Sequence, residues 1–591
     1  MKIFKVIKKT IFRYLPKKYY RQSLLICLAN FVGDLFELIG IGFIPIIIYN
    51  IFNPVELNQF LDEKNITIFN PILNHEFSIF ITFSILIVFF SFKNIFLLLV
   101  FYFQRKLLIK IDNSQKAEIF DRYLNCDYEY FIQKNPSYLI SLINVGVPET
   151  TSIIENILVI LREIFLILII FISIYFISPY AAIITTFCLI LFVLTFYLLT
   201  SKMASWRGKI FFIYKIKNIK VVNETFDLIK EIKLYGKENF FHKLFKYQQD
   251  ISEKQKLFNS IFNVLPRYII EISLLIVLLL ILYFSYYFLG DVNESIPVIT
   301  FISVSAIRLI PAFRMIATSF NTIIFRSTHL DTVLNEFEYL NKNIPVKINS
   351  TFKKKDIDIN FKDKIEISDL NFSYRNSKFN SLSIPKFQIK KGEKIGITGE
   401  SGSGKSTFVN LLTGLLKPSS GHITVDGHNI GENIIGWSKK VGYVPQKINF
   451  LDDNIKRNIA IGIKDENIDA ERLKDAIKIS NLTEFISKSE KGVERVIGNK
   501  AVKISGGQGQ RIGIARAFYN KPKILILDEA TNSLDKKNEL DIINDIISIK
   551  EITSIIIAHR VESLKNCDKV IVFEKGKIVK QGKFEEVIRN N

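Results

Sequence analysis

A glycine-rich loop carries the clearest chemical signal in this chain of 591 residues. Residues 394–398 (KIGIT) predict a short apolar strand, residues 399–406 read GESGSGKS, and an apolar helical pattern follows. In this context glycines let backbone N–H groups turn toward phosphate, and the helix N-terminus adds a positive dipole end. The residues expected to bind a nucleotide are Gly399, Glu400, Ser401, Gly402, Ser403, Gly404, Lys405, Ser406 and Thr407. Lys405 would reach the β- and γ-phosphates, and the Ser406 hydroxyl would bind Mg²⁺.

Two carboxylates follow a second apolar strand. Residues 523–527 (KILIL) are apolar, as a central parallel strand should be, and they lead directly into Asp528 and Glu529. One carboxylate can act on the Mg²⁺ shell, while the next can orient and deprotonate an attacking water. Together with the phosphate-binding loop they predict a hydrolytic site in which Glu529 is the general base.

Residues 502–510, VKISGGQGQ, resemble the signature loop of ATP-binding cassette (ABC) proteins. Other motifs follow in the family's order: Tyr374 resembles the aromatic residue that stacks on adenine, and Gln446 the residue that links Mg²⁺ and water to the membrane domain. Asp535 resembles the dimer-contact loop, and His559 the switch histidine that contacts the γ-phosphate. Each nucleotide contact has a structural alternative: Tyr374 could be an ordinary strand tyrosine, and His559 a structural histidine. The resemblance covers residues 365–591 and implies ATP and Mg²⁺ as cofactors.

The signature loop also implies a dimer. In the family, Ser505 and Gly507 complete the phosphate site of the facing domain, so one cassette cannot close a site alone. The resemblance assigns nucleotide contacts to Ser505, Gly506, Gly507 and Gln508, and implies a homodimer with two equivalent ATP sites. Three features depart from the family: Ile504 replaces a leucine, Gly509 replaces a longer polar residue, and in RVIGNKAV (495–502) Val496 and Asn499 occupy acidic places. The last departure affects the coupling between the ATPase domain and the membrane domain rather than ATP hydrolysis.

The composition predicts a membrane half joined to a soluble half. The chain is 49% hydrophobic with 51 Phe, yet its formal net charge is +21. Residues 164–201 contain no ionisable side chain and read as two spans broken at Ser178-Pro179. Four more spans are predicted at about 23–49, 77–103, 261–289 and 296–324. Disorder and a uniform soluble enzyme are both excluded.

The fold class predicted is therefore multidomain. It combines an all-α transmembrane domain of six helices, of the ABC exporter type, with an α/β phosphate-loop ATPase domain. The predicted domains are residues 1–340, with two long cytoplasmic helical hairpins, a polar linker at 341–364, and the cassette at 365–591. This order resembles the exporter branch of the family. A non-transport ATPase would lack the spans, and a channel would have no use for Glu529.

The distribution of charge predicts the orientation. Residues 1–22 carry eight basic side chains and no acid, whereas residues 51–76 carry four acids against one lysine. By the positive-inside rule the N-terminus and the ATPase domain are cytoplasmic, in a bacterial inner membrane, and no cleavable signal peptide is visible. The four cysteines predict neither a disulfide nor a metal site. The lysines are scattered, so no nucleic-acid partner is predicted.

Three arginines in the last two spans suggest the substrate. Arg267, Arg308 and Arg314 are costly in a bilayer, and surplus guanidinium groups suit a pyrophosphate. The segments EISLLIVLLL, preceded by PRY, and AIRLIPAF resemble lipid-linked oligosaccharide flippases, which implies a polyprenyl-pyrophosphate-linked glycan as cargo. Two alternatives remain: a general lipid, drug or peptide exporter, and internal pairing of the arginines, for instance Arg267 with Glu271. Asn65, in the predicted outward loop, lies in an acidic N-glycosylation pattern (63–67).

Overall fold

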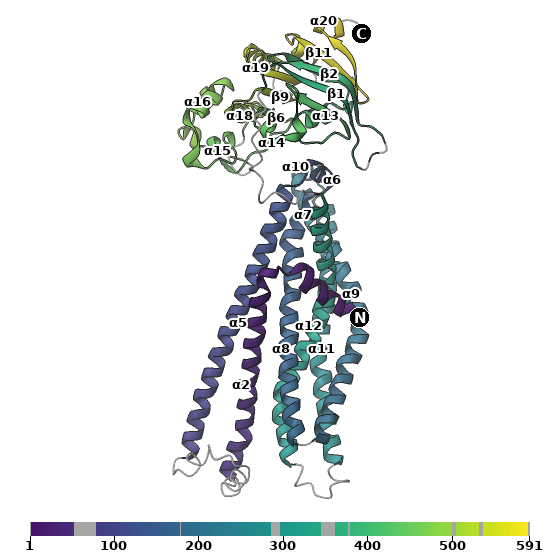
Figure 1. Cartoon of the computed structure of the whole chain (residues 1–591), viewed down its shortest axis with the longest axis vertical. Coiled ribbons are helices and arrows are strands. Elements are labelled where there is room, and N and C mark those ends of the chain that lie inside the picture. Colours follow the sequence, from purple (N-terminus) through teal and green to yellow (C-terminus); the bar gives the residue numbers. More distant parts are fainter. Residues whose placement is uncertain are drawn as a thin grey trace. The chain divides into compact units, whose positions relative to one another are not determined.

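The computed structural model describes residues 2–52, 78–177, 179–284, 296–343, 361–375, 377, 379–498, 504–530, 536–558 and 560–588. The chain forms two compact units (Figure 1). The first unit comprises Met1–Cys126 and Lys134–Pro345, and the second comprises Asp127–Gln133 and Val346–Asn591.

Long helices make up the first unit (Figure 1). Within the described residues six of them have at least 31 residues, which confirms the six-helix prediction. They are α2 (Tyr20–Phe52), α5 (Ser78–Leu124), α8 (Val147–Ile177), α9 (Pro179–Asp227), α11 (Glu238–Phe284) and α12 (Ile296–Asn343). The shorter helices are α1 (Lys2–Lys9), α7 (Pro136–Ser141) and α10 (Ile229–Tyr235).

The long helices expose apolar side chains as membrane spans do. Leu24, Val88 and Phe176 are each more than half exposed, which suits contact with lipid rather than water. Among the described residues, three stretches are long and apolar enough to cross a membrane: Lys17–Gly40, Phe83–Leu124 and Pro136–Phe176. The predicted outward loop with Asn65 lies outside the described residues.

Two sheets form the frame of the second unit. The four-stranded sheet has the order β2 (Leu382–Lys390), β1 (Lys364–Phe372), β4 (Ser420–Val425), β5 (His428–Asn429). The six-stranded sheet has the order β12 (Lys577–Gly582), β11 (Lys569–Glu574), β3 (Lys394–Gly399), β10 (Thr553–Ile557), β9 (Ile524–Asp528), β6 (Val441–Val444). Its strands are parallel except β12, and β9 and β10 are buried almost throughout because helices cover both faces of such a sheet. The carboxyl ends of five strands therefore meet at one edge.

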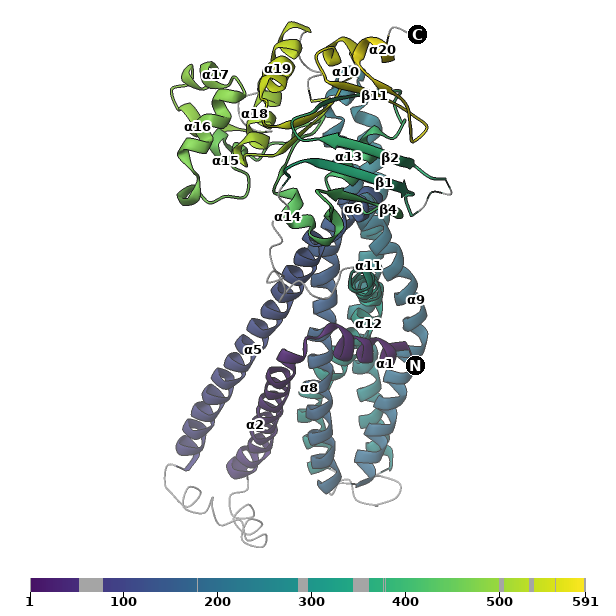
Figure 2. The same cartoon turned by 45° about the horizontal axis from the view of Figure 1, so that its top comes forward.

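Helices complete the second unit and confirm the α/β class. They are α6 (Tyr128–Gln133), α13 (Lys405–Leu412), α14 (Ile434–Ser438), α15 (Ile455–Ile459), α16 (Ala470–Ile479), α17 (Thr483–Ser487), α18 (Gly506–Tyr519), α19 (Lys536–Ser548) and α20 (Phe584–Ile588). One core, with the fully buried Phe408 and Trp437, lies between the two sheets and α13. A second core lies around α15, α16 and α18, which Figure 2 shows beside one another, and includes Leu482 and Ile512.

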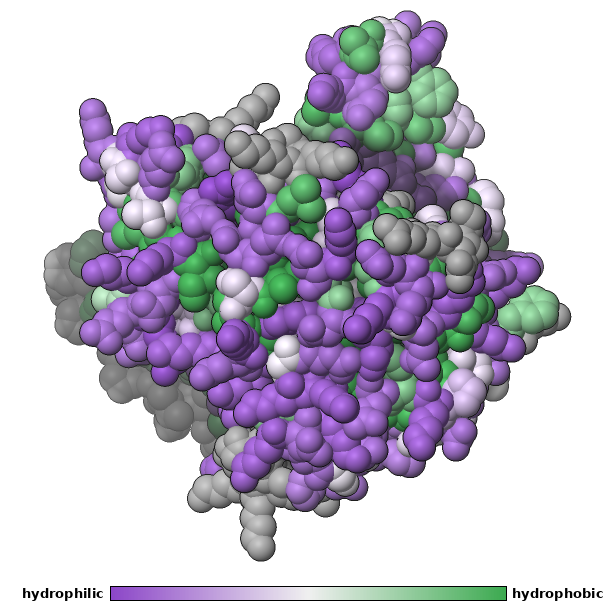
Figure 3. All heavy atoms as spheres, turned by 90° about the horizontal axis from the view of Figure 1, so that it is seen from above, coloured by the Kyte–Doolittle hydropathy of each residue, from purple (hydrophilic) through white to green (hydrophobic). Residues whose placement is uncertain are grey.

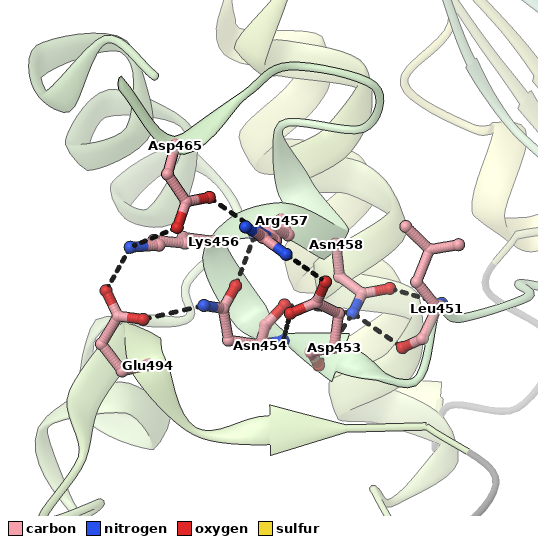
Figure 4. A network of polar contacts seen from close by, with 8 residues as sticks. All are labelled: Leu451, Asp453, Asn454, Lys456, Arg457, Asn458, Asp465 and Glu494. Atoms are coloured by element: carbon pink, nitrogen blue, oxygen red, sulfur yellow. Dashed lines mark hydrogen bonds and ion pairs between the residues drawn. The ribbon is translucent and has the colours of Figure 1, made fainter. Parts of the chain in front are cut away.

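A polar network ties α15 to the segment that precedes the signature loop (Figure 4). Strand β7 (Asp453–Asn454) pairs with β8 (Val496–Ile497). Val496 is thus a strand residue, and its side chain is exposed. Lys456 Nζ lies 2.5 Å from Glu494 Oε1, and Asn454 Nδ2 donates to Glu494 Oε2 at 2.7 Å. These bonds hold the segment as far as Ile497, whereas Asn499 lies outside the described residues.

Hydrophilic side chains cover most of the face drawn in Figure 3, and hydrophobic ones form small separate groups among them. No disulfide joins the cysteines whose side chains are described, Cys27, Cys126 and Cys567.

Candidate nucleotide-binding site

The phosphate-binding loop leaves β3 at Gly399 and enters α13 at Lys405. Gly399 has φ 144° and Gly404 has φ 104°, values that side chains rarely adopt. A Cβ at position 399 would lie 2.3 Å from the carbonyl oxygen of Phe573. Position 399 excludes a side chain because the loop turns tightly against β11, and position 404 favours glycine because of its positive φ.

Lys405 closes over this loop. Its Nζ donates to the carbonyl oxygens of Gly399, at 2.7 Å, and Glu400, at 2.8 Å, and the residue is 8% exposed. The ammonium group is thus held beside the turned backbone N–H groups, where it can exchange carbonyl partners for phosphate oxygens. The contact of Lys405 with the β- and γ-phosphates stays a prediction, and the structure shows its ammonium group held within the loop.

A polar cavity of about 570 Å³ opens beside the loop. Its lining contains these residues predicted from the sequence: Tyr374, Ser401, Gly402, Gly404, Lys405, Ser406, Thr407, Gln446, Asp528 and Glu529. It also contains four that the prediction missed: Asn380, Ser381, Lys575 and Gly576. Most of these residues follow the carboxyl ends of β3, β6, β9 and β11. Others come from the start of α13, from the segment after β1 and from the entrance to β2, so the edge of the parallel sheet assembles most of the site.

The two carboxylates, Asp528 and Glu529, line the same cavity as Lys405. Gln446 Nε2 donates to Glu529 Oε2 at 2.6 Å, and the Tyr443 hydroxyl donates to Asp528 Oδ2 at 3.0 Å. Burial raises the pKa of Asp528, because it disfavours the anionic form. A divalent cation would offset that effect, since it favours the carboxylate. Asp528, Ser406 and Gln446 line the cavity and could offer the hard oxygen ligands that Mg²⁺ prefers.

Glu529 is held in an unusual backbone conformation. Its φ is 51°, in the left-handed region that glutamate seldom occupies, and its N–H donates to the carbonyl oxygen of Ile557 at 3.1 Å. Such a conformation persists only where the surroundings over-determine it, and it is typical of functional positions. The strain is consistent with a carboxylate held in place for chemistry.

Tyr374 is half-buried at the edge of the cavity. Its hydroxyl lies 3.2 Å from Thr407 Oγ1, on α13, and its ring packs edge-on against Phe372 at a centroid distance of 4.9 Å. The ring is therefore fixed by neighbours and lines the cavity as a stacking platform would.

Replacing Tyr374 with alanine is expected to weaken ATP binding about 5- to 150-fold, because stacking of an aromatic ring on a base is worth about 1–3 kcal/mol. Tyr374→Phe keeps the ring and should bind within a few-fold of the wild type. Titration with a fluorescent ATP analogue measures both. Equal affinities for the alanine variant and the wild type would make Tyr374 an ordinary strand residue.

The signature residues begin α18 and do not line the cavity. Ser505 is the N-cap: its Oγ accepts from the N–H of Gln508, and Gln508 Oε1 accepts from the N–H of Ser505. Gly509 follows, where a Cβ would lie 3.3 Å from Phe450, which gives a packing reason for glycine there. The helix start is exposed and rigidly capped. Asp535 and His559 lie outside the described residues.

The turn at Lys575-Gly576 is the missed part of the site. Gly576 donates its N–H to the carbonyl oxygen of Ser403 at 2.9 Å and accepts from the N–H of Ser383 at 2.8 Å, so it joins the phosphate-binding loop to β2. Lys575 and Gly576 both have positive φ, as a tight hairpin turn between β11 and β12 requires. The sequence signal for this turn is the lysine-glycine pair that follows the mostly apolar strand KVIVFE (569–574).

The membrane arginines are partly paired. Arg308 forms an ion pair with Glu37, which also lies 3.7 Å from Lys93, and both Glu37 and Lys93 are buried. Arg267 Nε donates to Glu271 Oε1 at 3.1 Å, and both side chains are about half exposed. These pairs favour the alternative of internal pairing and remove the surplus charge expected at Arg308. Arg314 is exposed, and no ion pair is recorded for it within the described part of the chain.

Replacing Glu37 with alanine is expected to cost about 3–5 kcal/mol of stability, because it strips a buried carboxylate from Lys93 and Arg308. Glu271→Ala breaks the exposed pair of Arg267 and should cost less than about 1 kcal/mol. Thermal unfolding in detergent compares the two variants. An unchanged Tm for Glu37→Ala, with export lost, would instead give this pair a transport role.

Two parts of this chain match known protein families. A family model described as ABC transporter matches residues 382–532, and one described as ABC transporter transmembrane region matches residues 24–310. The leukotoxin translocation ATP-binding protein LktB of Pasteurella haemolytica-like sp. (strain 5943B) is 41% identical over 229 residues, 38% of this chain and 32% of that protein. LktB of Mannheimia haemolytica is 40% identical over 232 residues, 39% of this chain and 32% of that protein. The match thus spans about a third of these relatives' length.

A solved structure extends the likeness to the whole fold. The structure of a bacterial Atm1-family ABC exporter with ATP bound superposes with a TM-score of 0.74 at 18% identity, covering 97% of this chain and 96% of that one. At this identity the likeness shows the fold alone. With one family model on the nucleotide-binding part and the other on the membrane part, the chain is a half-transporter of the ABC transporter family with the exporter fold.

Proposed function

We propose that this chain is an ATP hydrolase that drives transport across a membrane, and that it works as a homodimer with two equivalent ATP sites. One observation carries the proposal: the cavity contains Lys405, Asp528 and Glu529, yet none of the described signature residues 505–508 lines it. The cavity and the signature residues belong to the same unit. A signature helix whose start is capped and exposed, and which does not line its own cavity, suits the cavity of a second copy.

Each residue then has a role in hydrolysis. The phosphate-binding loop and Lys405 hold the β- and γ-phosphates, and Ser406, Gln446 and Asp528 are the residues that would hold Mg²⁺. Mg²⁺ supplies neutralisation of the phosphate charge when bound. Glu529, held by Gln446, accepts the proton of the attacking water. His559 is proposed to contact the γ-phosphate, and Ser505 to Gln508 to complete the partner's site.

Phosphate release by the purified protein in lipid nanodiscs tests the activity. We expect turnover that depends on Mg²⁺ and is lost in Lys405→Ala together with ATP binding. Turnover that survives chelation of Mg²⁺, or binding unchanged in Lys405→Ala, would contradict the proposed chemistry.

The substrate stands between two classes. A polyprenyl-pyrophosphate-linked oligosaccharide, moved from the cytoplasmic to the outer leaflet of a bacterial inner membrane, is supported by the span-five and span-six segments and by the exposed Arg314. The pairing of Arg308 with Glu37 weakens that argument. A general lipid, drug or peptide exporter has at least equal support, and LktB is named for translocation of a leukotoxin, a protein.

Proteoliposomes separate these classes. A flippase should transfer a fluorescent lipid-linked sugar to the opposite leaflet only with ATP, and Arg314→Ala should abolish transfer while leaving basal ATP turnover intact. A general exporter should instead show ATP turnover stimulated by several unrelated hydrophobic compounds or peptides, with no transfer of the lipid-linked sugar.

A further inference from the structure

A groove between α2 and α5 shares no residue with the nucleotide-binding cavity described above. It encloses about 390 Å³. Figures 1 and 2 both show α2 lying beside α5, which continues beyond the start of α2. Both helices belong to stretches that are long and apolar enough to cross a membrane, where an apolar groove can hold a lipid chain.

The groove has an apolar part and a basic end. Its apolar lining is Leu25, Ile26, Ala29, Val100, Phe103 and Leu107. Lys106 and Lys110 line it as well, one helical turn apart on the same side of α5, together with Gln22 near the start of α2. From Gln22 to Ala29 the helix rises about 10 Å, so the polar end and the apolar part are separated along the groove.

The basic end carries no balancing acid in the neighbouring sequence. Residues 14–33 and 100–111 contain no Asp or Glu. Arg105 is neutralised by Glu155 at 2.8 Å, but within the described residues no ion pair is recorded for Lys106 or Lys110, and both are exposed. The positive-inside rule places these lysines at the cytoplasmic surface of the membrane.

We infer that this groove binds a phospholipid with an anionic headgroup from the cytoplasmic leaflet. The headgroup phosphate lies on Lys106 and Lys110, where the charges are complementary, and an acyl chain lies along Ile26 and Val100. An apolar groove that ends in two exposed ammonium groups matches a molecule with an anionic head and an apolar tail. The inference does not depend on the nucleotide site or on the cargo.

Lipid exchange in nanodiscs tests the site with the full-length protein. The membrane is phosphatidylcholine with increasing phosphatidylglycerol, and bound lipid is counted by native mass spectrometry. Lys106→Gln with Lys110→Gln should raise the phosphatidylglycerol fraction needed for half-occupancy about tenfold or more. Lys17→Gln with Lys18→Gln removes the same charge nearby, at residues that do not line the groove. This pair should change the phosphatidylglycerol fraction for half-occupancy less than twofold.

A second variant tests the apolar part. Ala29→Leu fills the groove and should displace the lipid although both lysines remain, while soluble glycerol phosphate at millimolar concentration should not compete in the wild type. Equal losses of bound phosphatidylglycerol in the Lys106/Lys110 and Lys17/Lys18 variants would mean that the lipid responds to overall surface charge, and would overturn the site. Retention of lipid in both the Lys106/Lys110 and the Ala29→Leu variants, or cross-links between Ala29→Cys copies that exclude the lipid, would overturn it too.

Discussion

Replacing Glu529 with glutamine is expected to lower ATP turnover about 10²- to 10⁴-fold, because the amide cannot accept the proton of the attacking water. The side chain keeps its shape, so the hydrogen bond with Gln446 and the strained backbone at φ 51° should persist. Binding of Mg-ATP should remain close to that of the wild type. The bound nucleotide should therefore accumulate unhydrolysed and hold the dimer closed.

Phosphate release and retention of labelled ATP measure the two effects separately. Glu490→Gln is a matched control, since Glu490 is an acid outside the cavity and its replacement should leave turnover unchanged. Near-normal turnover in Glu529→Gln would remove Glu529 as the base. Loss of binding together with turnover would instead assign Glu529 a structural role in forming the cavity.

The parts of this site that sequence patterns could predict are the local ones. Lys405 and Ser406 follow an apolar strand and begin a helix, and the loop between them and β3 requires glycine, so eight consecutive residues define the chemistry. Arg267 and Glu271 are one helical turn apart, and their contact follows from helical spacing alone. Such features depend on neighbours along the chain.

The parts that could not be predicted depend on packing across the fold. Gln446 meets Glu529 because β6 lies beside β9, an adjacency that neither motif encodes. Lys575 reaches the cavity because β11 pairs with β3 up to Gly399. Strand order within a parallel sheet is decided by crossover connections, which leave no local signal in the sequence.

Pairing between membrane helices shows the same limit. Arg308 and Glu37 lie on α12 and α2, at opposite ends of the membrane unit's sequence, and no periodic pattern joins them. The charges of the spans were visible from the sequence, but whether each was surplus or paired depended on which helices are neighbours. The pairing of Arg308 with Glu37 therefore weakens the prediction of a pyrophosphate-linked substrate. The prediction of the ATP site is not affected, because it depends on local motifs.

Mixing Lys405→Ala chains with Ser505→Arg chains is expected to restore ATP turnover that neither variant has alone. In a mixed dimer one site joins the two damaged elements, while the other joins an intact phosphate-binding loop to an intact signature helix. Random pairing of equal amounts makes about half of the dimers mixed, each with one of two sites competent, so recovery should reach about a quarter of the wild-type rate if the sites act independently. Phosphate release after co-expression with two different affinity tags measures it.

Ser505 is placed so that its replacement affects the partner's cavity rather than its own. Ser505 caps α18 and is absent from the lining of the cavity that contains Lys405, so an arginine there should leave its own cavity intact and obstruct only the partner's. Tandem purification shows whether mixed dimers have formed. Ser548→Arg, at an exposed serine at the end of α19 and outside the signature loop, serves as the control for placing an arginine in this unit. No recovery from demonstrably mixed dimers would contradict the composite site, because each chain would then be closing its own cavity. Activity of Ser505→Arg alone would contradict it as directly, since two obstructed sites would still be turning over.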